Sequence, residues 1–379
     1  MTKICVLGAG LVGGPMARDL SADAQFEVTV ADRDEAALAR LERRAPLRTV
    51  VRDLADPAVV AELCADADLV LEAMPGGLGF DTLRTVIESG RDVVSISFFA
   101  EDPFDLDELA RARGVTALVD CGVFPGMGSA LVMDAVTRRL DRAETITILV
   151  GGLPEHPEPP LYYRTVFSPS DVIAEYVRPA RHLEDGELVV RPALSDVEPV
   201  SFEGVGDLEA FATDGLRTLL RTIPCPYIRE KTLRLVGTAA QMALLRDLGL
   251  FDDSPLEVDG RAVSRHDLAL ALLGPLWRMP EGEGDLTAMR IEVAGVKDGA
   301  PRTVRWELLD RWDREAGILS MARTTGYTAT AALRMVADGT YAHAGVSPPE
   351  YLGREARHVE RLLKELGKRN VIYREVGDR

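Results

Sequence analysis

Three glycines and one aspartate near the start of the chain have the spacing of a dinucleotide-binding site. Gly8, Gly10 and Gly13 follow a short apolar run, and a second apolar run ends at Asp32. The glycines permit a tight turn, a close approach of the backbone to a pyrophosphate, and close packing of a following helix whose N-terminus attracts phosphate. Asp32 stands where a carboxylate can bind both hydroxyl groups of the adenosine ribose. The simpler alternative is a glycine turn in a parallel sheet without a ligand.

The carboxylate of Asp32 also discriminates between two cofactors. It would repel the 2′-phosphate of NADP, which favours NAD. Arg33, the next residue, can partly offset that repulsion, although stacking on the adenine or facing solvent is its more usual role. We therefore expect NAD, with NADP as the less favoured cofactor. The residues expected to contact it are Gly8, Gly10, Leu11, Val12, Gly13, Asp32, Arg33, Asp53, Leu54, Met74, Pro75, Ser97, Gly122 and Val123.

Strand and helix patterns alternate through the first third of the chain. Apolar or β-branched runs predict strands over residues 3–7, 27–31, 47–52, 68–74, 92–97 and 115–120. Helical patterns lie between them, for example over residues 34–44, and a helix over residues 127–139 leaves the domain. Strands joined by helices of this length predict an α/β Rossmann domain with a doubly wound parallel sheet. Ligands of such sheets bind beyond the carboxyl ends of the strands.

The middle of the chain predicts an α+β domain with a largely antiparallel sheet. Residues 144–150 form a strand pattern, and the proline-rich residues 154–160 must be irregular. Alternating runs over residues 287–296 and 302–309 flank a short turn and indicate a β-hairpin. The apolar side of this hairpin needs cover, so we expect a homodimer or larger homo-oligomer built through this domain. Its apolar side includes Ile291, Val293, Val304 and Trp306.

The end of the chain contains a helical pattern over residues 330–337 and an amphipathic one over residues 350–366. We expect this tail to pack back on the nucleotide domain. The predicted boundaries are 1–128 for the nucleotide domain, 129–336 for the substrate and dimerisation domain, and 337–379 for the C-terminal segment.

Composition excludes several classes of partner. Lys and Arg total 44 against 61 Asp and Glu, giving a net charge of −17. This argues against nucleic acid and anionic membranes, which need a basic face. No apolar stretch is long enough to span a membrane, and a first strand at the N-terminus argues against a signal peptide. The cysteines lack metal-ligand spacing, so we expect reduced thiols in a cytoplasmic protein without a metal. They are Cys5, Cys64, Cys121 and Cys225.

The chain resembles the saccharopine dehydrogenase-like reductases along nearly its whole length. The motifs that carry the resemblance are GAGLVGGPMARDL from Gly8, VDCGVFPGM from Val119, VGGLPEHPEPPLYYRTVFSP from Val150, ALSDVEPVSF from Ala193, FATDGLRTLLRT from Phe211, KTLRLVG from Lys231, MARTTGYTA from Met321 and GVSPPE from Gly345. The resemblance implies hydride transfer between a nicotinamide cofactor and a carbon that bears an amine nitrogen. It is strongest to the lysine-oxidising members, which convert the ε-amino group of L-lysine to 2-aminoadipate 6-semialdehyde and release ammonia.

Two sequence features depart from the lysine-oxidising pattern. Those members commonly have Gly-His after the KT(L/I)R motif, whereas this chain has Gly237-Thr238. The identity of the catalytic base is therefore open. The loop after the fourth strand carries Gly76, Gly77 and Gly79, and we expect it to enlarge the substrate pocket.

Oxidation of an amine requires a base, because an ammonium ion has no lone pair with which to form the iminium. Free lysine titrates near pH 10.4. Asp120 follows a strand on the ligand edge and is the first candidate base, with capping of the next turn as its alternative role. Lys231 is the second candidate, with a surface or interface charge as its alternative role.

The expected substrate-binding residues are Gly77, Phe98, Tyr163, Asp214, Arg234 and Thr238. Asp214 can hold an ammonium group and Arg234 a carboxylate, or each can form an ordinary ion pair. Tyr163 can donate a hydrogen bond or simply pack. The family resemblance implies that Asp120, Asp214, Lys231 and Arg234 line one cleft.

Two other functions stay open at this stage. The first is a reductase of the saccharopine or carboxynorspermidine type, which makes or cleaves a secondary amine. The second is a regulatory protein that binds NAD without turnover. Motifs in both domains argue against the regulatory protein, because a sensor needs no second-domain pocket.

Overall fold

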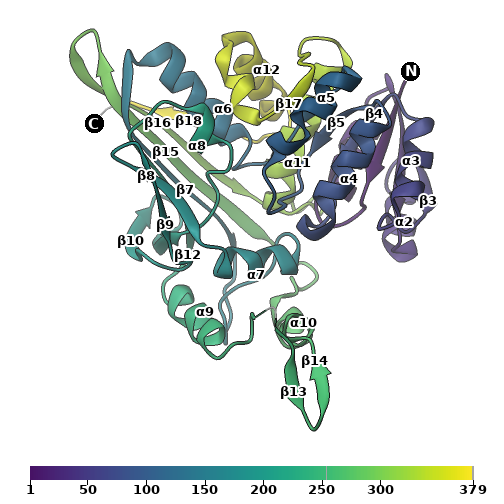
Figure 1. Ribbon diagram of the computed structural model, residues 1–379, viewed down its shortest axis with the longest axis horizontal. Helices are drawn as coiled ribbons and strands as arrows, with labels where there is room; N and C mark the ends of the chain where they lie inside the picture. Colours follow the sequence, from purple (N-terminus) through teal and green to yellow (C-terminus); the bar gives the residue numbers. More distant parts are fainter. Residues whose placement is uncertain (253, 378–379) are drawn as a thin grey trace. The chain divides into compact units, whose positions relative to one another are not determined.

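The computed structural model describes residues 1–252 and 254–377. It divides into two compact units, each with its own large sheet (Figure 1). The first unit joins Met1–Arg138 to Met321–Ile372, and the second unit joins Arg139–Ser320 to the segment that starts at Tyr373. Each unit therefore combines two stretches that are far apart in the sequence.

The first unit is built on a seven-stranded parallel sheet. Its strands are β1 (Thr2–Leu7), β2 (Phe26–Asp32), β3 (Arg48–Val51), β4 (Leu69–Glu72), β5 (Asp92–Ser95), β6 (Thr116–Leu118) and β17 (Gly345–Ser347). In the order β17-β6-β5-β4-β1-β2-β3 all neighbours are parallel. The chain moves outward from β1 to β3 and then from β4 to β6, so the strand order reverses between β1 and β4. The predicted doubly wound sheet is confirmed, with a ligand-binding switch point between these two strands.

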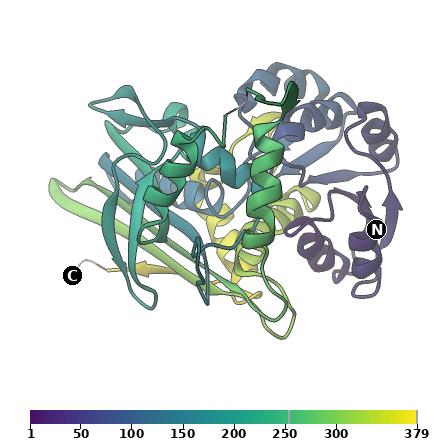
Figure 2. The same ribbon diagram turned by 90° about the horizontal axis from the view of Figure 1, so that it is seen from below.

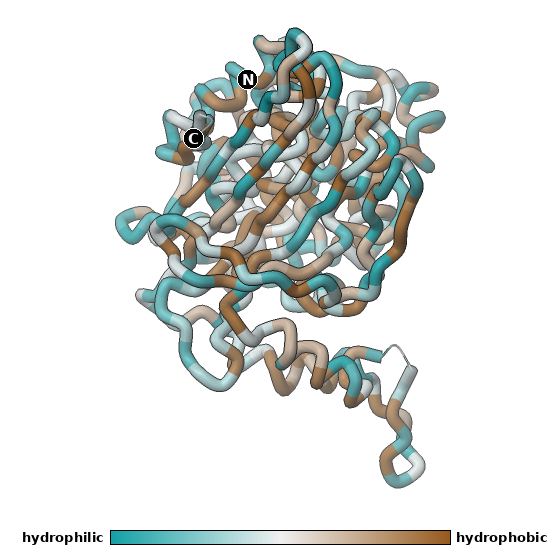
Figure 3. Tube along the Cα trace, turned by 90° about the vertical axis from the view of Figure 1, so that its left-hand side faces the viewer, coloured by the Kyte–Doolittle hydropathy of each residue, from teal (hydrophilic) through white to brown (hydrophobic). Residues whose placement is uncertain are grey.

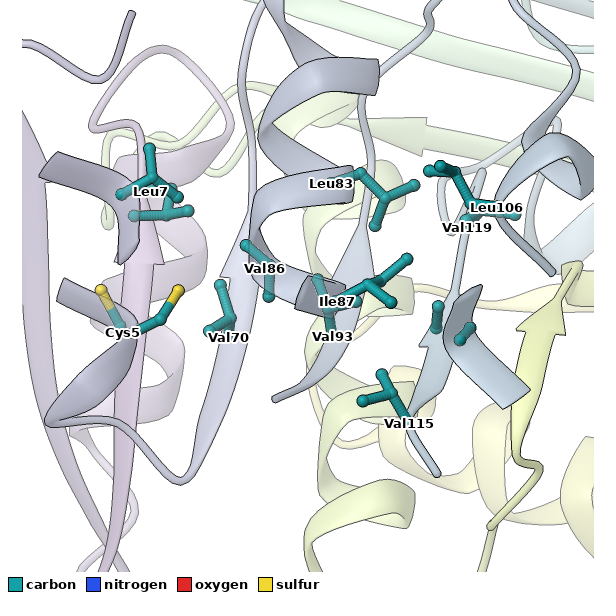
Figure 4. Close-up of a cluster of buried hydrophobic side chains, with 14 of the residues drawn as sticks. Cys5, Leu7, Val70, Leu83, Val86, Ile87, Val93, Leu106, Val115 and Val119 are labelled. Atoms are coloured by element: carbon teal, nitrogen blue, oxygen red, sulfur yellow. The ribbon is translucent and has the colours of Figure 1, made fainter. Parts of the chain in front are cut away.

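Helices lie on both faces of this sheet (Figures 1 and 2). The helical elements are α1 (Gly13–Ser21), α2 (Glu35–Glu42), α3 (Pro57–Ala65), α4 (Gly76–Glu88), η1 (Pro103–Leu106), α5 (Asp107–Arg113), α6 (Met127–Asp134) with its π-helical extension η2 (Ala135–Arg139), α11 (Ser320–Ala337), η3 (Pro349–Arg354) and α12 (Ala356–Gly367). Asp34 and Asp56 begin α2 and α3, because each side chain accepts a backbone N–H bond of the first turn. The apolar face of α4 buries Val86 and Ile87 against Val70 of the sheet (Figure 4).

The second unit is built on a nine-stranded, largely antiparallel sheet. Its strands are β7 (Arg142–Pro154), β8 (Ala180–Glu184), β9 (Glu187–Arg191), β10 (Glu198–Phe202), β11 (Gly206–Ala212), β12 (Tyr227–Leu235), β15 (Asp285–Lys297), β16 (Ala300–Arg311) and β18 (Tyr373–Val376). Its other elements are α7 (Pro169–Val177), α8 (Leu219–Thr222), α9 (Thr238–Asp247), α10 (Arg265–Trp277) and the small hairpin of β13 (Leu256–Val258) and β14 (Arg261–Val263). Only the pair of β12 and β7 is parallel among the described pairs of this sheet. The predicted α+β architecture is confirmed.

The predicted hairpin is present as β15 and β16. Lys297 pairs with Ala300, so the turn consists of Asp298 and Gly299, both with positive φ, as a tight hairpin turn requires. The long strands of this unit alternate between hydrophilic and hydrophobic residues (Figure 3).

The reason given for a second subunit is wrong. Ile291, Val293, Val304 and Trp306 are all buried within the chain itself. The hairpin is also covered along both edges, because β15 pairs with β7 and part of β16 pairs with β18. Its apolar side therefore leaves nothing for a partner to bury.

The C-terminal part of the chain belongs to both units. The helix expected over residues 330–337 is α11, which begins ten residues earlier, and from Met321 onward it groups with the first unit. Arg334 of α11 forms an ion pair of 2.8 Å with Asp19 of α1. β17 adds a strand beside β6, whereas β18 pairs with β16. The structure thus divides the chain after residues 138 and 320, where the sequence suggested 128 and 336.

Three further findings concern membrane-spanning helices, metal sites and cysteines. No helix within residues 1–252 and 254–377 is both long and apolar enough to cross a membrane. The same ranges contain no group of three or more side chains arranged to bind a metal ion. The four cysteines are buried free thiols.

Candidate nucleotide and substrate sites

The glycine turn between β1 and α1 has the shape that a dinucleotide requires. Gly8 has a φ of +105°, and a Cβ on it would lie 2.7 Å from the carbonyl oxygen of Ala73. A Cβ on Gly13 would lie 2.1 Å from the carbonyl oxygen of Gly8. A Cβ on Gly10, in contrast, would meet no heavy atom within 4 Å. Gly8 and Gly13 therefore permit the close packing, while Gly10 faces the open side where a pyrophosphate can approach.

The N-terminus of α1 supports the same conclusion. Val12 stands at the cap position, and no side chain caps the helix there. Leu11, beside it, is 49% exposed. An uncapped helix start beside an open glycine offers N–H groups and a positive dipole to a phosphate. The residues present fit a dinucleotide.

Asp32 is held in place at the end of β2 by two backbone amides. The N–H of Ala9 donates to Oδ2 at 2.6 Å, and the N–H of Asp34 donates to Oδ1 at 2.8 Å. Each carboxylate oxygen can accept a further hydrogen bond, so the ribose hydroxyls can still be bound. Arg33 is exposed.

The two expected cofactor residues that follow β3 each have a structural role. Asp53 is exposed and accepts the N–H of Ala55 at 3.1 Å, which shapes its own turn. Leu54 is 4% exposed and packs in the apolar core. Only the backbone of Leu54 is therefore available to a ligand.

The VDCGVFPGM motif forms a compact loop from β6 to α6. Asp120 is buried, with a φ of +50°. The N–H of Gly122 donates to the carbonyl oxygen of Pro125 at 3.0 Å, and a Cβ on Gly126 would lie 1.8 Å from the carbonyl oxygen of Gly122. The side chain of Val123 is buried, so Gly122 and Val123 too can meet a ligand only through their backbone. The loop fixes Asp120 at the carboxyl edge of the sheet.

An acid that the sequence did not single out lies at the centre of this edge. Glu72 is fully buried at the end of β4, and Oε1 accepts the N–H of Met74 at 2.9 Å. The hydroxyl oxygen of Ser97 lies 2.5 Å from Oε1 and 2.6 Å from the carbonyl oxygen of Met74, and the Ser95 hydroxyl bonds to Oε2. Burial raises the pKa of Glu72 to about 7. Its signal was an acid inside an otherwise apolar strand pattern.

The remaining expected residues of the first unit lie around the same edge. Met74 and Ser97 are in contact, as just described. Pro75 is exposed at the cap position of α4. Gly77 is exposed in open space, and Phe98 is half-buried.

In the second unit, Arg234 lies in a buried cluster against α7. Its Nη2 donates to Glu175 at 2.7 Å, its Nε donates to the Tyr176 hydroxyl at 3.3 Å, and its Nη1 donates to the carbonyl oxygen of Leu233 at 3.0 Å. The guanidinium also lies 4.9 Å from the centre of the Tyr163 ring. Burial raises the pKa of Glu175, an effect that Arg234 opposes. The contacts form the buried ion pair that the sequence left open as an alternative, and a role in binding carboxylate stays a prediction.

Lys231 lies on the other face of the sheet from Arg234. The two residues are three positions apart on β12, and successive side chains of a strand point to opposite faces. The contacts agree, because Lys231 Nζ donates to the carbonyl oxygen of Asp196 at 2.6 Å and lies 3.2 Å from Glu198 of β10. The expectation that Lys231 and Arg234 line one cleft is therefore wrong. The ammonium of Lys231 is already engaged, which weakens its case as a base.

The structure also shows what surrounds the three other expected residues of the second unit, Asp214, Thr238 and Tyr163. Asp214 binds Arg181 through both carboxylate oxygens, at 2.8 and 2.9 Å. Thr238 is buried, and its hydroxyl donates to the carbonyl oxygen of Leu235 at the start of α9. The Tyr163 hydroxyl is buried and has no hydrogen-bond partner within the described ranges, and its ring packs edge-on against Trp277. A role for these residues in binding a substrate stays a prediction.

A second buried acid that the sequence did not single out is Glu230, on the same face of β12 as Arg234. Its carboxylate accepts the hydroxyl of Thr213 and the N–H of Gly215, at 2.8 and 3.1 Å. A Cβ on Gly215 would lie 2.6 Å from Glu230 Oε2, so the glycine permits this contact. Burial raises the pKa of Glu230 to about 8.

Comparison with protein families decides the relationship. Residues 4–118 match the saccharopine dehydrogenase NADP binding domain, and residues 122–372 match the saccharopine dehydrogenase C-terminal domain. The chain belongs to the saccharopine dehydrogenase family. It is therefore a member of a family of oxidoreductases, as the sequence resemblance implied.

Individual relatives are distant, and they match either most of the chain or about half of it. The saccharopine dehydrogenase [NADP(+), L-glutamate-forming] of Saccharomyces cerevisiae is 22% identical over 445 residues, covering 98% of both chains. The mitochondrial alpha-aminoadipic semialdehyde synthase of Mus musculus is 28% identical over 193 residues, which is 49% of this chain but only 21% of that protein. The solved apo saccharopine dehydrogenase (L-Glu forming) of S. cerevisiae has a TM-score of 0.81 at 20% identity over 100% of both chains, so the fold is shared.

Proposed function

We propose that this chain is a pyridine-nucleotide-dependent oxidoreductase that acts on a carbon bearing an amine nitrogen. The observation that carries the proposal is the glycine turn, in which Gly8 and Gly13 are packed tightly while Gly10 stays open beside Asp32. Membership of the saccharopine dehydrogenase family supports an amine as the group oxidised. When bound, the nicotinamide accepts or returns the hydride.

The side chains of the protein must then supply proton transfer. The amine has to lose its proton before hydride leaves the neighbouring carbon, and water must later add to the resulting imine. Asp120 is the proposed base, because its buried carboxyl is fixed at the carboxyl edge of the sheet by the loop that follows β6. Thr238 does not replace the family histidine as a base, since its hydroxyl donates to the carbonyl oxygen of Leu235 at the end of β12.

The proposed substrate is L-lysine, oxidised at its ε-carbon to 2-aminoadipate 6-semialdehyde with release of ammonia. The motif resemblance supports this substrate, and the name of the mouse relative refers to the same semialdehyde. A second candidate is oxidative cleavage of the secondary amine saccharopine. The yeast relative favours it, because that protein covers 98% of this chain and its name specifies glutamate formation.

A spectrophotometric assay with L-lysine and saccharopine, each with NAD and with NADP, separates these candidates. Lysine oxidation should reduce the nucleotide and release ammonia without glutamate, whereas saccharopine cleavage should release glutamate. The saccharopine reaction alone would overturn the lysine assignment. Nucleotide binding with no turnover of any amine would overturn the enzyme and favour the regulatory alternative.

The proposed cofactor is NAD. The position of Asp32 supports it, because a carboxylate fixed at the ribose repels a 2′-phosphate. The name of the family model and of the yeast relative point instead to NADP. Direct titration with both nucleotides decides the preference.

Assembly into a homo-oligomer and a cytoplasmic location also stay proposals. Four leucines on or next to α9 and α10 are at least 40% exposed, and a second copy would shield them. They are Leu244, Leu248, Leu272 and Leu276. The four free thiols are compatible with a reducing compartment. Light scattering at micromolar concentration tests assembly, and a monomer would contradict it.

A further inference from the structure

The contacts of Glu72 bear on whether its carboxyl group carries a proton. The Ser97 hydroxyl has one proton but lies within hydrogen-bond distance of both Glu72 Oε1 and the Met74 carbonyl oxygen. A carbonyl cannot donate. Both contacts are therefore full hydrogen bonds only if Glu72 Oε1 carries a proton, donates it to Ser97, and Ser97 donates its own to Met74.

The other contacts of Glu72 are compatible with a neutral acid. Oε2 accepts the Ser95 hydroxyl, and Oε1 can still accept the N–H of Met74. Among the described residues no charged side chain shifts its pKa, which burial raises and the hydrogen bonds of Ser95, Ser97 and Met74 lower. An ionised carboxylate would be buried without a counter-charge, which is costly.

The acid holds together the parts of the nucleotide edge. Met74 belongs to the turn from β4 to α4, Ser95 is the last residue of β5, and Ser97 follows two residues later. The same turn packs on the glycine turn, because the carbonyl of Ala73 is the atom that a Cβ on Gly8 would meet. Movement of this turn therefore reaches the site where the pyrophosphate would bind.

We propose that Glu72 is a positioning residue of the nucleotide site, which acts as a neutral acid to hold the turn after β4 against the end of β5. Ionisation removes the proton donated to Ser97, so Ser97 donates to the carboxylate and the Met74 carbonyl loses its donor. The turn is then released and the nucleotide binds less tightly. This inference rests on the proposed function for the nucleotide but on no particular substrate.

The first test is the affinity for NAD, measured by isothermal titration between pH 6 and pH 9. The wild-type dissociation constant should rise about three- to tenfold as the pH passes through the pKa of Glu72, the effect of losing one hydrogen bond. Glu72→Gln cannot ionise and still donates to Ser97, although it gives up the Met74 N–H contact. Its affinity should be modestly weaker at pH 6 and independent of pH. The matched control is Glu88→Gln, the same change at an exposed residue of α4, which should follow the wild type.

A second readout needs no nucleotide. A carboxyl whose pKa is raised on folding contributes most to stability below its unfolded value and loses that contribution as the pH rises to its folded value. The melting temperature of Glu72→Gln relative to the wild type should therefore increase between about pH 4.5 and pH 7 and be constant above. A structural role with an ionised Glu72 predicts no such trend.

The outcomes separate the two proposals. If the wild type binds NAD with an affinity that does not change between pH 6 and pH 9, the proposal for Glu72 is overturned while the proposed function stands. If the wild type binds neither NAD nor NADP at any pH, the proposed function fails and the role of Glu72 fails with it. If Glu72→Gln does not fold, the wild-type profile and Ser97→Ala, which should weaken NAD binding at pH 6, still decide the matter.

Discussion

Two polar sites of this protein, the nucleotide edge of the first unit and the Arg234 cluster of the second unit, are built in different ways. In the first unit, Asp32 is fixed by backbone amides and Glu72 by serine hydroxyls and a backbone amide. In the Arg234 cluster, Arg234 is fixed mainly by the carboxylate of Glu175, and on the other face of β12 Lys231 is likewise paired with Glu198. The first arrangement leaves an edge open to an anion, whereas the second neutralises its own charges.

This difference predicts different consequences when a charge is removed. A charge held by backbone can be lost without leaving a buried opposite charge, so the effect should fall on ligand binding or turnover. Removal of one member of a buried ion pair leaves its partner uncompensated, so the effect should fall on stability. Substitutions at a charge held by the backbone and at a buried ion pair test whether the two kinds of site respond in these different ways.

The largest expected effect belongs to Arg234→Ala. Arg234 is buried, while the Glu175 side chain is 21% exposed, so we expect the lower end of the cost for breaking a buried pair, about 3 kcal/mol. The melting temperature should fall by roughly 6–12 °C. Thermal unfolding measures this, and an unchanged melting temperature would show that the cluster is not a structural pair.

Arg181→Ala is the matched control for that prediction. It removes an arginine from the Asp214 pair, but the Arg181 side chain is 38% exposed. Solvent-exposed pairs contribute about 0–1 kcal/mol, so the change should be small. If both variants lose equal stability, burial is not what distinguishes the two pairs.

Asp120→Asn is expected to affect turnover instead. Asparagine keeps the shape and much of the capping ability of the carboxylate but removes its charge. We expect amine oxidation to fall about a hundredfold, the low end for one acid–base group, with NAD affinity and melting temperature nearly unchanged. Steady-state kinetics on the identified amine measures the loss.

The corresponding control is Asp56→Asn, at an aspartate that only caps a helix. Asp56 accepts the N–H of Ala58 at the start of α3, and asparagine can do the same. Turnover should therefore be unchanged. Normal turnover in Asp120→Asn would assign Asp120 the same capping role.

The contrast also explains what could be predicted from the sequence. A backbone-built site needs glycine where a side chain would collide, as at Gly8 and Gly13, and this requirement leaves a fixed spacing in the sequence. Strand and helix patterns likewise follow from local periodicity, so the parallel sheet and the hairpin were predicted. Both the glycine spacing and the strand and helix patterns depend on residues that are close together in the sequence.

The Arg234 cluster could not be predicted in the same way, because its partners are distant in sequence. Arg234 meets Glu175, 59 positions away, and nothing in the KTLRLVG motif indicates that contact. The two faces of β12 also separate Lys231 from Arg234, although one short motif contains both. Glu72 was missed for a related reason, since the serines that contact it lie at the end of the next strand and just after it.

The smallest effect concerns Asp32, where charge and geometry can be separated. Asp32→Ala removes the ribose acceptor and leaves the amides of Ala9 and Asp34 without their partner, so NAD should bind about tenfold more weakly, a loss of about 1.4 kcal/mol. Asp32→Asn keeps an oxygen for one amide and a polar group for the ribose, so it should weaken NAD less. Both changes remove the charge that repels a 2′-phosphate, so both should narrow the preference for NAD over NADP. Titration of the three proteins with the two nucleotides measures this, and a wild type that binds NADP more tightly would show that Arg33 or another group outweighs the carboxylate.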